Sequence, residues 1–145
     1  MKKGTSHLLR KLLALVGMVA LIALGACTPT SSPTDLDSLI DSLEDAGAVV
    51  QPAGVISQPF LAVTGRVVKV DNTDVQVFEY PGTTAANADA DMVSADGSSV
   101  GTTMISWVAT PHFYKSGKLI VLYVGDNQEV ISTLQGVLGL QFAGG

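Results

Sequence analysis

The first periodic run of hydrophobic positions after the N-terminal region predicts a helix over about Asp35–Ala46. Its apolar residues recur at i, i+3, i+4 and i+7, the spacing of one helix face: Leu36, Leu39, Ile40 and Leu43. Thr34 and Asp37 make a capping pair at its start, and Gly47 ends it. The chain after residue 34 therefore opens with an amphipathic helix.

Short β-rich runs follow. Ala48–Gln51 predicts a short strand, and the proline and glycine signals after it predict an irregular segment over Val55–Val63. Arg66–Val70 and Val75–Tyr80 predict a hairpin, with a four-residue turn over Asp71–Asp74.

In the second half, the alanine-rich stretch Thr84–Ser94 predicts a helix. Met104–Ala109 predicts a strand that Pro111 bends or interrupts and that His112–Lys115 continues. A tight reversal at Ser116-Gly117 then leads into the next strand.

The strand Lys118–Val124 is apolar on both faces, with Leu119, Val121 and Tyr123 on one and Ile120, Leu122 and Val124 on the other. This pattern predicts a central strand covered on both sides. A final helix, about Asn127–Leu138, begins at a capping pair of Asp126 and Glu129; its inward residues are Val130, Ile131, Leu134, Val137 and Leu138. The order α-β-β-β-α-β-β-α predicts a small single α+β domain with a largely antiparallel sheet of four or five strands and three helices.

The N-terminal region has the pattern of an export signal. Four basic residues precede an uncharged run of thirteen, Leu12–Leu24, which is too short to span a bilayer. The run ends in Leu24-Gly25-Ala26-Cys27, which resembles the lipobox of bacterial lipoproteins. The resemblance implies that signal peptidase cleaves after Ala26 and that lipid-transfer machinery attaches diacylglycerol to the Cys27 sulfur, with a further acyl chain such as palmitate on the new amine. An ordinary secretory signal is the alternative.

This organisation divides the chain into three parts: a signal peptide over 1–26, a lipidated cysteine and flexible tether over 27–34, and an extracytoplasmic domain over 35–145. Membrane lipid is then the first partner, and the location is the cell membrane or outer membrane, facing away from the cytoplasm. Removal of 1–26 leaves 4 basic and 13 acidic residues, a net charge of 4 − 13 = −9. Such a charge argues against nucleic acid as a partner. With Cys27 as the one cysteine, a disulfide framework is excluded.

His112 and Tyr114 are the candidate site residues of the domain. On a strand they share one face, and an imidazole beside a phenol, or beside the carboxylate of Glu79, can transfer protons near neutral pH. The competing hypothesis is that His112 hydrogen-bonds a loop carbonyl and locks the turn at Pro111. Neither hypothesis involves a cofactor.

Other polar clusters favour structural roles. Asn87, Asp89 and Asp91 resemble the start of a calcium loop, but the required glycine and glutamate are missing, so we expect a solvated helix face and no metal site. Ser98–Thr103 has neither a nucleophile elbow nor a phosphate loop and predicts a turn. The large aromatics are expected in the core: Phe78, Tyr80, Trp107, Phe113 and Tyr123.

Segments from about Ala46 to Phe142 also resemble a group of small, uncharacterised bacterial lipoproteins. They are Gln58–Phe60, Val75–Tyr80, Asp96–Met104, Pro111–Tyr114 and Leu119–Gly125. That group has no assigned activity, so the resemblance transfers neither an activity nor a site residue to this chain. The sequence therefore predicts a lipid-anchored binding or scaffold module that has no catalytic residues. The alternatives are a small hydrolase-like envelope enzyme that uses His112, or an accessory subunit of a membrane complex with a protein partner.

Overall fold

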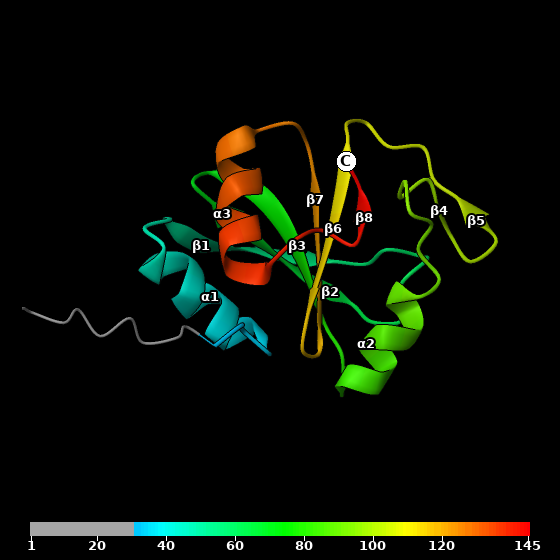
Figure 1. The fold of residues 1–145 in the computed structure, drawn as a ribbon, viewed down its shortest axis with the longest axis horizontal. Coiled ribbons are helices and arrows are strands. Elements are labelled where there is room, and N and C mark those ends of the chain that lie inside the picture. Colours follow the sequence, from blue (N-terminus) through cyan, green and yellow to red (C-terminus); the bar gives the residue numbers. More distant parts are fainter. Residues whose placement is uncertain (1–30) are drawn as a thin grey trace, which may run out of the picture.

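The computed structural model describes residues 31–145, so the predicted signal peptide 1–26, Cys27 and the first residues of the predicted tether lie outside the described part. Within it, three helices and eight strands form one small α+β domain (Figure 1). The helices are α1 (Leu36–Asp45), α2 (Thr83–Ala90) and α3 (Gln128–Leu138). The strands are β1 (Val50–Ile56), β2 (Gly65–Val70), β3 (Thr73–Glu79), β4 (Ser99–Val100), β5 (Thr103–Met104), β6 (Pro111–Ser116), β7 (Leu119–Val124) and β8 (Ala143–Gly144).

Six of these strands form an antiparallel sheet in the order β1-β2-β3-β7-β6-β8, and β4 and β5 form a separate small hairpin. The predicted class, with three helices and a largely antiparallel sheet, is confirmed. The sheet has more strands than the four or five predicted, because β8 at the end of the chain pairs with β6. Two residues carry too little pattern to reveal a strand.

The central position of β7 is confirmed, since β3 pairs with it on one side and β6 on the other. On one face of β7, the side chains of Leu119, Val121 and Tyr123 belong to the core under α1 and α3. On the other face, those of Ile120, Leu122 and Val124 belong to the core under α2. Figure 1 shows α1 and α3 together on one side of the sheet and α2 on the other.

Two details of the first half differ from prediction. Val55 and Ile56 belong to β1, which continues past a bulge between Pro52 and Gly54 instead of ending in an irregular segment. The β2–β3 turn contains two residues rather than four. Asp71 and Asn72 both have positive φ, 48° and 67°, the conformation that fits the twist of a two-residue hairpin.

The predicted strand over Met104–Ala109 is wrong. The chain leaves β5 after Met104, and the loop that follows turns Trp107 onto the aromatic core. There the indole N–H donates to the Gly97 carbonyl at 2.7 Å, and the ring packs edge-on against Phe60 and Phe113. Pro111 begins β6 instead of interrupting a strand.

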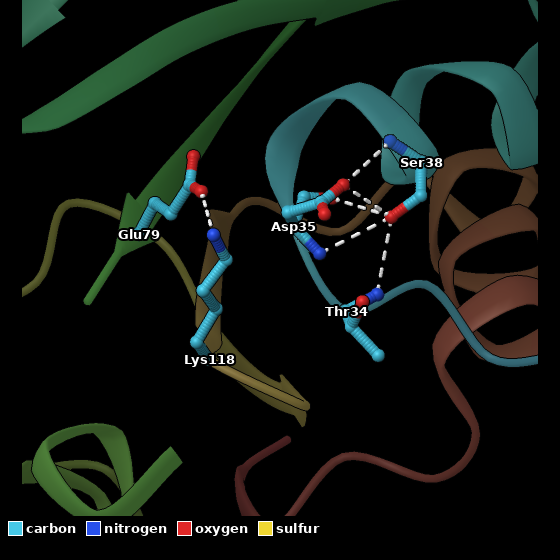
Figure 2. A network of polar contacts seen from close by, with 5 residues as sticks. All are labelled: Thr34, Asp35, Ser38, Glu79 and Lys118. Carbon is cyan, nitrogen blue, oxygen red and sulfur yellow. Dashed lines mark hydrogen bonds and ion pairs between the residues drawn. The ribbon is translucent and has the colours of Figure 1, made fainter. Parts of the chain in front are cut away.

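The helix caps also differ from the predicted pairs. Asp35 caps α1 through a reciprocal capping box with Ser38, which replaces Thr34 and Asp37 (Figure 2). These hydrogen bonds from Ser38 lower the pKa of Asp35. Asn127 caps α3, while the Asp126 carboxylate accepts a hydrogen bond from the Thr110 hydroxyl. Both caps lie one residue beyond the position predicted from spacing.

The chain reaches α1 through a fixed contact rather than a free linker. Pro33 is buried, and its carbonyl accepts a hydrogen bond from the Ser116 hydroxyl at the β6–β7 turn. The Thr34 carbonyl accepts from the Lys118 backbone N–H at 3.2 Å. A Cβ added at Gly117 would lie 2.7 Å from the Thr34 Cα, so the turn leaves no room for a side chain there. Pro33 and Thr34 are therefore packed against the β6–β7 turn.

Ser116→Ala is expected to loosen this contact without opening the sheet. Loss of one hydrogen bond worth about 0.5–1.5 kcal/mol should speed amide exchange at Lys118 by about two- to tenfold. Hydrogen–deuterium exchange measured by NMR tests this. The Tyr80 amide is the control, because it donates to the Lys118 carbonyl on the same turn but does not contact Pro33 or Thr34. Equal acceleration at Tyr80 would show that the variant opens the turn itself.

Candidate functional site

A groove lies between the N-terminal half of α1 and the strands β1, β2 and β3. It consists of two adjoining hollows with volumes of about 460 and 500 Å³, which share Leu36, Arg66 and Glu79 in their walls. Volumes of this size are typical of sites for small ligands. The remaining walls are mainly apolar, with Ile40, Pro52, Val55 and Val67 in one hollow and Val63, Val77 and Pro81 in the other.

The groove exists because α1 covers only part of its face of the sheet. Arg66, Val68 and Val70 alternate onto that face along β2; the two valines are buried under the helices, while Arg66, near the start of the strand, is exposed. On β3 the same alternation buries Val75 and Val77 and leaves Glu79 exposed at the end of the strand. On each strand, the line of side chains under α1 therefore ends in a charged residue just past the helix, Arg66 on β2 and Glu79 on β3.

Some charged side chains in the groove have a partner of opposite charge and others do not. Lys118 Nζ lies 2.7 Å from Glu79 Oε1, and this hydrogen bond raises the pKa of Lys118 (Figure 2). Elsewhere, Lys69 pairs with Asp74 and Lys115 donates to the Asn87 side chain. Arg66 differs from these three lysines because its side chain forms neither an ion pair nor a hydrogen bond within residues 31–145. The groove therefore presents one guanidinium that is free to bind an anion.

His112 lies at the other end of the sheet and is engaged on both ring nitrogens. Nδ1 lies 2.6 Å from Gln141 Oε1, and Nε2 lies 3.0 Å from the Gly125 carbonyl oxygen. The ring is 6% exposed and stacks on Tyr123 at a centroid distance of 5.8 Å. Through Gln141, whose amide donates to the Gly144 carbonyl, the imidazole connects β6 to β8. This geometry fits the hypothesis that His112 has a structural role. Its partners are the Gly125 carbonyl, just after β7, and the Gln141 side chain, just before β8, so the ring connects these segments.

The structure does not assemble the predicted acid–base partners around His112. Tyr114 shares the face of His112, as expected, but its hydroxyl is buried without a hydrogen-bond partner in the described domain. Burial raises the pKa of Tyr114. Glu79 pairs in register with Leu119 and His112 with Tyr123, four residues further along β7. At about 3.3 Å per residue the separation along the strand is about 13 Å, so His112 and Glu79 cannot meet.

Asp89 departs from the solvated helix face that the sequence predicts. Asn87 and Asp91 are exposed, but Asp89 is buried and accepts hydrogen bonds from the Tyr80 hydroxyl at 2.7 Å and the Ala62 backbone N–H at 2.8 Å. Burial and the Asp89 carboxylate both raise the pKa of Tyr80 well above its usual value. The pair fixes the 57–63 loop against α2. Across the described domain, no group of three His, Cys, Asp or Glu side chains is placed to hold a metal ion.

The serine- and glycine-rich segment forms the β4–β5 hairpin, in agreement with the predicted turn. Just before it, the Asp96 carboxylate accepts hydrogen bonds from the side chains of Ser94 and Ser98 and from the Ser98 backbone N–H. These bonds lower the pKa of Asp96 to about 2. The carboxylate therefore serves to order the turn.

Comparison with known proteins adds no relative: no family model matches the chain, and no curated protein or solved structure is significantly similar to it. Among residues 31–145, no helix combines the length and hydrophobicity that a membrane span needs. The groove was missed by sequence reasoning. The available signal was Arg66, one of only four basic residues after position 26, at the start of an apolar strand.

Proposed function

We propose that the chain is a lipid-anchored lipoprotein of the cell envelope and that its domain is a binding module that uses the groove between α1 and β1–β3. The anchor is Cys27, as the lipobox resemblance implies, and the domain faces away from the cytoplasm. The observation that carries the binding role is the groove itself. It combines an apolar lining with Arg66, a cation without an ionic partner in the described domain.

The position of the groove relative to the anchor supports the proposal. Only five residues lie between Cys27 and Pro33, whose carbonyl is bound by Ser116, and the six residue steps between them span at most about 20 Å. Thr34 and Asp35 lie next to Lys118 and Glu79, which line one end of the groove (Figure 2). A short anchor attached beside the groove keeps the groove close to the membrane surface.

Cys27→Ser is expected to abolish membrane anchoring, because the thiol is the proposed acceptor of the lipid. Two acyl chains give stable membrane attachment, whereas one gives only marginal binding. Detergent phase partitioning of the variant and the wild type tests this. Thr28→Ser is the matched control, since it alters the neighbouring position and keeps the thiol. If the Cys27→Ser protein has its signal cleaved and still enters the detergent phase, the anchor is elsewhere.

A further inference from the structure

We propose that the groove binds the carboxyl end of an extended apolar peptide, and that Arg66 binds its terminal carboxylate. This inference rests on the proposed function, since it names the class of ligand for the same groove. The argument has three parts: the charge that is available, the chemistry of the walls, and the exposed edge of the sheet.

The groove contains two cations and two carboxylates. Glu79 is paired with Lys118, so these two charges largely neutralise each other. The guanidinium of Arg66, which lines both hollows, and the carboxylate of Asp37 in the first hollow form no ion pair within residues 31–145, so each can contact a ligand. A guanidinium presents a planar pair of N–H donors that matches a carboxylate and binds it with two parallel hydrogen bonds. The complementary ligand group is therefore an anion with carboxylate geometry.

The walls favour a peptide over a simple acyl chain. The walls contain polar groups that can accept or donate hydrogen bonds beside their apolar side chains, including Asp37, Thr64 and Lys118. An acyl chain offers those polar groups no partner, whereas a peptide supplies amide N–H and carbonyl groups beside its side chains.

The sheet edge beside the groove is exposed, although Pro52 lacks a backbone N–H and the bulge between Pro52 and Gly54 limits how many residues of β1 can pair with another strand. β1 pairs only with β2 among the described strands, and it contributes Pro52, Gly54 and Val55 to the wall of the groove. Residues 51–55 are all exposed. An edge strand offers backbone groups to an incoming strand, and capture of a terminal carboxylate is a recurrent way of fixing the end of such a peptide.

The test uses the full lipidated protein in phosphatidylcholine nanodiscs, with empty nanodiscs as the blank. The probes are acetyl-Leu-Val-Val with a free carboxyl group and the same tripeptide as its carboxamide. Methyl NMR spectra locate binding, since the methyl groups of Leu36 and Ile40 line the groove while that of Leu134 lies in the core below α3. Titration of the shifts gives the Kd of each peptide.

We expect the free acid to shift the methyl signals of Leu36 and Ile40 and to bind about tenfold more tightly than the carboxamide. Arg66→Met, which keeps an unbranched side chain but removes the charge, should raise the Kd of the acid by about tenfold and leave that of the carboxamide unchanged. Lys69→Met is the matched control. It removes the same charge from the opposite face of the same strand and should change neither Kd by more than about twofold.

The outcomes separate this inference from the proposed function. If acid and carboxamide bind equally at Leu36 and Ile40, the groove is a binding site but recognition of the carboxylate by Arg66 is overturned. If Lys69→Met weakens the acid as much as Arg66→Met, the effect is one of net charge and the inference is also overturned. If neither peptide shifts the groove signals, peptide recognition at this groove is overturned, whereas anchoring at Cys27 is judged by its own partitioning test.

Discussion

Leu122→Ala is expected to lower the free energy of unfolding by about 2–5 kcal/mol, the range for removing a large side chain from a packed core. Leu122 is fully buried in the middle of β7, between β3 and β6, and it packs in the core under α2 with Phe78 and Phe113. The substitution removes apolar contacts on a central strand, where the surrounding backbone cannot move in to fill the cavity.

Urea unfolding of the purified protein measures this change. The matched control is Val108→Ala, because Val108 is 98% exposed and its truncation should change stability by less than about 0.5 kcal/mol. If Leu122→Ala costs as little as the control, β7 does not contribute to stability in the way that its position in the sheet implies.

The second prediction concerns His112. Alanine at this position removes the imidazole, whose Nδ1 contacts Gln141 Oε1 and whose Nε2 contacts the Gly125 carbonyl oxygen, and leaves at least one of these acceptors without its donor. We expect a loss of about 1–3 kcal/mol, and a smaller loss for His112→Asn, which keeps a donor and an acceptor on a shorter side chain. Thermal and urea unfolding measure both variants.

A double-mutant cycle with Gln141→Ala provides the control. If His112 stabilises the domain by connecting β6 to β8 through Gln141, the two substitutions should cost less together than the sum of the separate losses. A catalytic role makes the opposite prediction, since replacing a residue retained for function often leaves stability unchanged or raises it. Unchanged or raised melting temperatures in both His112 variants would overturn the structural role and favour a site centred on His112.

The elements with strong periodicity could be predicted from the sequence. α1 and α3 turn their predicted faces toward the sheet, although Leu36, Ile40 and Val137 are only half-buried, and β7 has two buried faces because all six of its positions are apolar. These segments could be identified because local pattern and tertiary environment agree in them. The length of the turn at Asp71-Asn72 was predicted wrongly, as four residues instead of two, since asparagine and aspartate suit turns of several lengths.

Elements fixed mainly by tertiary contacts could not be predicted. β8 depends on pairing with β6 and on the Gly144 N–H bond to the Ala95 carbonyl. Trp107 leaves the predicted strand because an aromatic cluster and the Gly97 carbonyl lie within its reach. Asp89 is buried because the Tyr80 hydroxyl, nine residues earlier in the chain, meets it. No local pattern contains this information.

The candidate site shows the same limit. His112 and Tyr114 were selected from the sequence because of their chemistry. In the structure the His112 ring contacts Gln141 and the Gly125 carbonyl, and Tyr114 is buried in the core. The groove depends on how far α1 extends across β2 and β3, which is a property of helix packing rather than of any segment. Arg66 gains its significance only from that packing.

The contacts of β6 also determine when the domain can finish folding if the chain is exported as we propose. Its Ser116 hydroxyl bonds to a carbonyl 83 residues earlier, while His112 bonds to a side chain 29 residues later. A chain that crosses the membrane from its N-terminus delivers Gln141 long after Pro33 has emerged. Until then β6 has no outer neighbour, so the sheet passes through a stage with an unpaired edge, at which aggregation is a hazard.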